Sequence, residues 1–202
     1  MIHYLVDPKL KIKKIEEIID PPVIILVNKF DEPGAKTFRE DMQKAINTGQ
    51  KVIPVMIDSY GGQVYSLMSM IDTIKSSPVP VATVSSGKSM SCGSALLSCG
   101  TEGLRFMDRN ATVMIHSVSS MTFGKLDEIK ADAKETERLN NLIFHTMARN
   151  IGKADDFFLK AIHDKNHADW FLTSEECKEI NLVNHIRVPK FTVKLSTDLT
   201  FE

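Results

Sequence analysis

Three residues whose side chains can together carry out acyl transfer stand in separate parts of the chain. Ser91 lies within the stretch Gly-Lys-Ser-Met-Ser-Cys-Gly-Ser-Ala, His116 ends the run Val-Met-Ile-His, and Asp169 opens Asp-Trp-Phe-Leu-Thr. A serine nucleophile, a histidine base and a carboxylate that orients the base form the minimum set for this chemistry. We therefore take Ser91, His116 and Asp169 as candidate catalytic residues.

Alternating strand and helix patterns must position these side chains. Short apolar runs between turn residues predict strands, and apolar residues that recur every three or four positions predict helices. The third expected strand ends at Ser85-Ser86-Gly87. The alternation predicts an α/β domain with a largely parallel sheet. The expected strands cover 23–27, 52–57, 79–84, 104–107 and 111–115, and the expected helices cover 35–47, 64–74, 92–99, 126–150 and a last segment that opens at 173.

Two glycine-marked turns, Gly61-Gly62 and 87–91, each follow an expected strand and precede an expected helix. In α/β sheets such turns gather at the carboxyl ends of strands, where ligands bind. A helix that begins after Ser91 leaves backbone N–H groups free at that place. Glycine at position 62 also lets a substrate approach the backbone closely. The N–H groups of Gly62 and Cys92 are therefore candidate donors to an oxyanion.

Bulk properties exclude several function classes. The chain has 202 residues, a formal net charge of −1, 43% hydrophobic residues and 25% charged residues. Nucleic acid is not an expected partner, because no basic excess exists to neutralise phosphates. No apolar run approaches the ~20 residues that cross a bilayer, so no membrane partner is expected. Gly87-Lys88-Ser89 is not a phosphate-binding loop, because Ala82 stands where such a loop has glycine.

Cysteine usage favours a cytoplasmic location and no cofactor. The three cysteines, Cys92, Cys99 and Cys177, form no close pair, which is typical of reduced thiols. No Cys/His cluster has zinc spacing, so no metal is expected. We expect an N-terminal arm over 1–20, one domain over 21–188 and a β-prone C-terminal tail over 189–202.

Taken together, the stretches of sequence around Gly61-Gly62, Ser91, His116 and Asp169 resemble those of ClpP, the proteolytic subunit of the Clp protease family. The family carries a Ser-Pro-Gly-Gly turn and characteristic sequence motifs around its catalytic serine, histidine and aspartate. The resemblance covers roughly residues 20–188. It implies a serine endopeptidase in which Ser91 is the nucleophile, His116 the general base and Asp169 the carboxylate that holds the imidazole. The matching stretches, in the same order and at matching intervals, are Ser59-Tyr60-Gly61-Gly62, Gly87 through Ser94, Met114-Ile115-His116 and Asp169 through Thr173.

The resemblance also implies a fold and an assembly. The fold would stack β-β-α units, as in the crotonase-like superfamily, with 126–150 as a handle helix that interlocks two rings. The family forms stacked heptameric rings around a chamber and works with an AAA+ unfoldase, which implies a homo-oligomer that acts on polypeptides. Segment 117–124 would bind substrate as an added strand. The residues expected to contact substrate are Gly61, Gln63, Val64, Ser117, Val118 and Ser119.

The chain departs from the family pattern within and beside these motifs. Tyr60 replaces the proline of the glycine turn, and Cys92 replaces a methionine. Trp170 replaces an arginine that takes part in ring–ring contacts, and Ser117-Val118 follows the histidine where Gln-Pro is usual. The first 30 residues lack the family's axial-loop signature.

Three other interpretations stay open. The chain could be an inactive ring subunit that regulates active relatives, a Ser/Lys enzyme resembling signal-peptide peptidases with Lys88 as base, or a crotonase-like acyl-CoA enzyme that needs only the paired oxyanion amides. Asp155, Asp156 and Asp164 are neighbouring candidates for the carboxylate. Asp169 is preferred because it opens the motif Asp-Trp-Phe-Leu-Thr, which resembles the family's motif around its aspartate.

Overall fold

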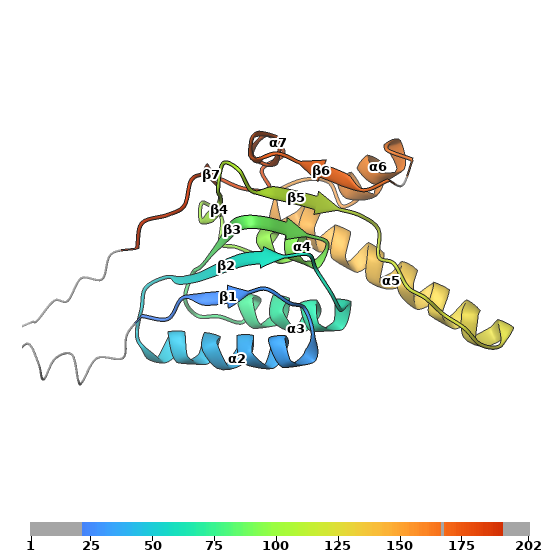
Figure 1. Ribbon diagram of the computed structural model, residues 1–202, viewed down its shortest axis with the longest axis horizontal. Helices are drawn as coiled ribbons and strands as arrows, with labels where there is room; N and C mark the ends of the chain where they lie inside the picture. The colour runs from blue at the N-terminus through green and yellow to red at the C-terminus, as the bar shows by residue number, and fades with distance from the viewer. Residues whose placement is uncertain (1–21, 167, 192–202) are drawn as a thin grey trace, which may run out of the picture.

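In the computed structural model, which describes residues 22–166 and 168–191, a seven-stranded sheet lies beside a set of helices (Figure 1). The arm expected over 1–20 and most of the tail expected over 189–202 lie outside the described residues. The α/β prediction is confirmed. In chain order the elements are β1 (Ile25–Val27), α2 (Glu32–Asn47), β2 (Ile53–Ser59), α3 (Val64–Lys75), β3 (Val81–Met90), α4 (Cys92–Ser98), β4 (Arg105–Met107), β5 (Thr112–Ile115), α5 (Leu126–Asn150), α6 (Phe157–Asp164), β6 (Trp170–Leu172), α7 (Ser174–Glu179) and β7 (His185–Ile186).

The sheet topology brings the ends of three strands to one edge. The strand order is β1-β2-β3-β4-β7, and β5 and β6 branch from β3. The first half of β3 pairs with β4 and the second half with β5, both parallel. β6 pairs antiparallel with β5. Because β2, β3 and β5 run parallel, the residues just after Ser59, Met90 and Ile115 emerge at the same edge of the sheet.

β3 is longer than the sequence predicted, and the expected strand end at Ser85-Ser86-Gly87 is wrong. Gly87 has φ +87°, and the pairing with β2 shifts register at this point, so the strand bulges and continues. The polar side chains that resembled a turn are used inside the strand, where Ser89 Oγ donates to Ser85 Oγ at 2.8 Å. The bulge carries β3 onward to the nucleophile candidate.

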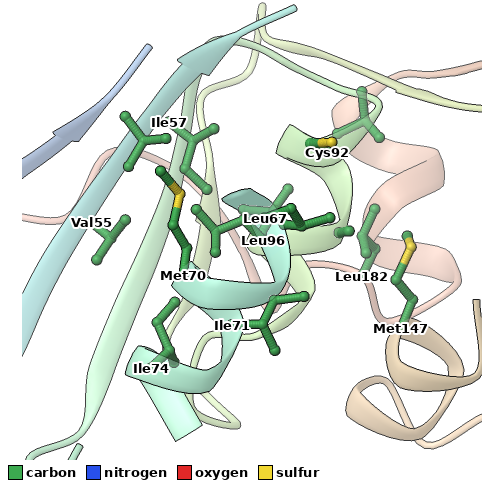
Figure 2. Packing of buried hydrophobic residues seen from close by; sticks show 14 of the residues in the cluster. Val55, Ile57, Leu67, Met70, Ile71, Ile74, Cys92, Leu96, Met147 and Leu182 are labelled. Atoms are coloured by element: carbon green, nitrogen blue, oxygen red, sulfur yellow. The ribbon is translucent and has the colours of Figure 1, made fainter. Parts of the chain in front are cut away.

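Helices α2 and α3 lie side by side on one face of the sheet (Figure 1). Asp31 begins α2 as an N-cap and accepts a hydrogen bond from the Gly34 N–H at 2.8 Å. Figure 2 shows the apolar stripe of α3 facing β2 and α4. Every residue of α4 is buried, which requires the small side chains seen in Cys-Gly-Ser-Ala. The residues labelled on these three elements are Val55, Ile57, Leu67, Met70, Ile71, Ile74, Cys92 and Leu96.

The long helix α5 has the bounds that the sequence predicted. Buried positions begin only at Leu139, so the first half of the helix projects beyond the rest of the domain (Figure 1). The second half packs into the core through Ile143, Phe144 and Met147. No helix within the described residues is both long and apolar enough to span a membrane.

One buried arginine joins the ends of several elements. The Arg105 side chain is 1% exposed, and its guanidinium pairs with Glu102 at 2.7 Å. It also donates to backbone carbonyls that terminate helices or turns, which satisfies acceptors that a helix end leaves unpaired. The acceptors are the carbonyl oxygens of Gly100, Asn150, Asn181 and Leu182, at 3.1 to 3.4 Å.

Candidate active site

Ser91 lies between β3 and α4 in an unusual backbone conformation. Its φ of 53° and ψ of −118° place a residue other than glycine at positive φ. Such a conformation costs of order 1–3 kcal/mol and persists only where surrounding contacts enforce it. The Ser91 N–H donates to the Met114 carbonyl at 2.8 Å, and Ser94 Oγ donates to the Ser91 carbonyl at 2.7 Å. The turn is therefore fixed from both sides.

His116 follows the last residue of β5, and its Nε2 atom lies 2.8 Å from Ser91 Oγ. The parallel register explains this contact, because Met90 pairs with Met114 and the residues beyond both strands emerge together. Both side chains are half-buried. With Nε2 unprotonated, the ring can accept the serine proton. The structure thus brings together two residues that a helix and two strands separate in the sequence.

Asp169 lies one position before β6, and β6 is the strand that flanks β5. The antiparallel register pairs Ile115 with Trp170, so the next positions along, His116 and Asp169, lie across from each other. Asp169 is exposed, and the hydrogen bonds among the described residues include none between its carboxylate and the His116 ring. The register places the two residues opposite each other and shows no contact between their side chains, so the catalytic role of Asp169 stays a prediction.

The two glycines form the other side of the Ser91 turn. A Cβ on Gly61 would lie 2.7 Å from Ser91 Cβ, and a Cβ on Gly62 would collide with the Phe30 carbonyl oxygen. Cys92 Sγ donates to the Gly62 carbonyl at 3.3 Å, which links the two predicted oxyanion residues. The backbone hydrogen bonds of the described turns assign no acceptor to the N–H of Gly62 or of Cys92.

A small cavity of about 60 Å³ opens beside Ser91 and His116. Of the six residues expected to contact substrate and the two expected oxyanion donors, the three substrate residues Val64, Val118 and Ser119 and both donors line this cavity. The other three expected substrate residues, Gly61, Gln63 and Ser117, do not line it. The wall is mostly apolar, so the cavity suits an apolar side chain.

Much of the apolar wall comes from helix residues that the sequence did not connect with the site. Leu67 of α3 and Ile143, Phe144 and Met147 of α5 all line the cavity. Their helical spacing marked them only as core residues, because spacing gives the buried face of a helix and not what that face meets. A cavity between elements becomes visible only when the elements are packed.

Two other nucleophile or base candidates are disfavoured by their surroundings. Lys88 Nζ lies 2.6 Å from Asp58 Oδ1 and 4.4 Å from the centre of the Tyr60 ring. The hydrogen bond to Asp58 raises the pKa of Lys88, so this amine is charged and cannot act as a base. Burial raises the pKa of the Cys92 thiol, which keeps it protonated beside Ser91.

The carboxylates near Asp169 in sequence have other surroundings. Asp155 pairs with Arg149 at 2.6 Å, and Asp156 pairs with Lys160 at 2.6 Å. Neither forms a hydrogen bond to the His116 ring. Within the described residues, no group of histidine, cysteine and acidic side chains could hold a metal ion.

A sheet of this topology, with a long projecting helix and paired serine and histidine at its carboxyl edge, has the ClpP/crotonase-like fold. The chain belongs to the Clp protease family, whose sequence model matches residues 9–190. It is 35% identical over 136 residues to the ATP-dependent Clp protease proteolytic subunit 3 of Nocardia farcinica, a match that covers 66% of this chain and 60% of the relative. It is 34% identical over 135 residues to subunit 2 of Corynebacterium jeikeium, covering 66% and 63%. Each match thus spans less than two thirds of the relative.

Proposed function

We propose that this protein is a serine endopeptidase and the proteolytic subunit of an ATP-dependent Clp-type protease. The observation that carries the proposal is the 2.8 Å contact between His116 Nε2 and Ser91 Oγ, beside two backbone N–H groups that donate to no carbonyl of the described turns. A nucleophile in contact with its base, next to donors for a developing negative charge, is the arrangement that acyl transfer needs.

In the proposed mechanism Ser91 Oγ attacks the carbonyl carbon of a peptide bond while His116 Nε2 takes the hydroxyl proton. The N–H groups of Gly62 and Cys92 stabilise the oxyanion, each contributing on the order of 3 kcal/mol. His116 then gives its proton to the leaving amine, and water hydrolyses the acyl-enzyme by the same route. Asp169 would orient the imidazole once its carboxylate reaches the ring.

The proposed active form is a homo-oligomer, a heptameric ring or a double ring around a chamber. Large apolar side chains at and just before the start of α5 support contact between copies, because monomers rarely expose such a cluster. We extend the proposal to an AAA+ unfoldase partner, polypeptide substrates and a cytoplasmic location, which the three free cysteines favour. The exposed cluster consists of Met121, Phe123, Leu126 and Ile129, with exposed fractions of 84%, 86%, 65% and 42%.

Labelling with a fluorophosphonate probe tests the catalytic proposal. The probe should modify Ser91 in the wild type, fail on Ser91→Ala, and react at least ~10³-fold more slowly with His116→Ala, because the base is removed. Ser86→Ala, five positions earlier on strand β3, is the matched control and should label normally. Native mass spectrometry of the same samples reports the assembly. An assembled wild type that takes up no label refutes the peptidase proposal.

A second candidate is an inactive ring subunit that regulates active relatives. The observation in its favour is that the hydrogen bonds among the described residues include none between the Asp169 carboxylate and the His116 ring. This candidate predicts rings without peptidase activity and a Ser91→Ala variant indistinguishable from the wild type in the assembled complex.

A further inference from the structure

The segment that follows β5 is tied to α5 by two hydrogen bonds. The Val118 N–H donates to Asn140 Oδ1 at 3.0 Å, and Thr136 Oγ1 donates to Ser120 Oγ at 3.0 Å. Asn140 and Thr136 are four positions apart, so they lie on the same face of α5. That face therefore holds the segment 117–120 along much of its length.

The same part of α5 also reaches the opposite side of the cavity. Tyr65, the second residue of α3, donates from Oη to Glu135 Oε1 at 2.8 Å. Arg138 holds this carboxylate with bonds of 2.8 and 2.7 Å and, with Tyr65, lowers the pKa of Glu135 to about 2. One and a half turns of α5 thus contact both segments that border the cavity, the start of α3 and the segment after His116.

The contact with Asn140 satisfies a backbone group that proline would not present. Val118 stands where the resemblance places proline, and proline has no N–H. Val118 is half-buried and lines the cavity with Ser91 and His116. Without an acceptor this half-buried N–H would be unpaired, which costs free energy, and the segment would be destabilised in this position.

We propose that Asn140 is a positioning residue that fixes segment 117–119 for pairing with an extended substrate. It acts through the Val118 N–H and contacts neither the reacting atoms nor Ser91. The inference rests on the proposed peptidase function and deepens it. Strand addition needs an edge held straight and in register, because backbone hydrogen bonds supply much of the affinity. The side-chain amide of Asn140 fixes that edge at its centre.

Three variants separate this role from a general effect on stability. Asn140→Leu removes the acceptor at nearly constant size, Asn140→Asp keeps an acceptor for the Val118 N–H, and Asn141→Leu is the matched control one position along α5. For a fluorogenic peptide that spans the scissile bond, Asn140→Leu should lower kcat/KM about tenfold, mainly through KM. Asn140→Asp and Asn141→Leu should stay within about threefold of the wild type. The rate at which a small fluorophosphonate labels Ser91 should change little in all three.

Amide hydrogen exchange over 117–120 gives a readout that needs no activity. The Val118 amide should exchange faster in Asn140→Leu than in the wild type and should stay protected in Asn140→Asp. Wild-type kcat/KM in Asn140→Leu, equal losses in both Asn140 variants, or unchanged exchange overturns the positioning role alone. A wild type that neither labels at Ser91 nor cleaves peptide refutes the proposed function, and the positioning role with it.

Discussion

Gly61→Ala tests whether the glycine turn sets the position of Ser91. Gly61 has φ +108°, and an added Cβ would lie 2.7 Å from Ser91 Cβ and 3.1 Å from both Ser91 Oγ and the Met90 carbonyl oxygen. Both Cβ atoms are fixed to the backbone, so no rotamer change relieves the overlap and one turn must move. A displacement of 1 Å at a catalytic group costs about 10²-fold in rate. The positive φ adds of order 1–3 kcal/mol of destabilisation.

Gly103→Ala is the control, because Gly103 also has positive φ, +81°, but no atom lies within 4 Å of the added Cβ. In urea titrations Gly103→Ala should lose only the unfolding free energy that its positive φ costs, and Gly61→Ala should lose more because of the overlap. Only Gly61→Ala should lose Ser91 labelling by a fluorophosphonate, by about 10²-fold. If Gly61→Ala labels at the wild-type rate, or if Gly103→Ala loses as much activity, the steric argument is wrong.

Three further predictions concern the carboxylate, the buried arginine and the acidic side chain on α5. Asp169→Asn should lower kcat for a peptide by a factor that reaches about 10⁴ in the best-studied triad, and a loss below about threefold would give the orienting role to another group. Arg105→Met should lower the urea-derived unfolding free energy by about 3–5 kcal/mol, because it leaves buried carbonyl oxygens unpaired, and a loss under about 1 kcal/mol would contradict this. The pKa of Glu135 is lowered from 4.5 to about 2. The difference in unfolding free energy between the wild type and Glu135→Gln should therefore be complete above pH 4.5 and should disappear as the pH falls through about 2. A difference that grows on acidification would refute that assignment.

The order of elements from β1 to α5 and the candidate pair Ser91 and His116 could be predicted from the sequence, because both depend on local pattern. The apolar spacing of 126–150 gave the bounds of α5, since a long amphipathic stripe is the strongest periodic signal. Ser91 and His116 were chosen for their residue types and the stretches around them, and the structure places Ser91 Oγ 2.8 Å from His116 Nε2 because parallel strands bring such positions to one edge. The missing link between His116 and Asp169 could not be predicted, because register places residues opposite each other without fixing side-chain contacts.

Features that depend on packing or on a shifted register were beyond the sequence. The serines of 85–89 have turn composition, yet a bulge at Gly87 lets their hydroxyl groups bond each other inside β3. Asn140 is one polar residue among many on α5, and nothing local marks the Val118 N–H as its partner. The short strands β6 and β7 form because neighbouring strands offer an edge, which intrinsic propensity does not report.

The hydrogen bond from the Ser91 N–H to the Met114 carbonyl has a consequence for the order of folding. It spans an intervening helix and strand, so it forms only after β5 has added to β3, and such long-range pairings close late. The left-handed turn at Ser91 has no local support before that event. A chain still emerging from the ribosome, or one that has lost β5, therefore lacks the assembled serine–histidine pair.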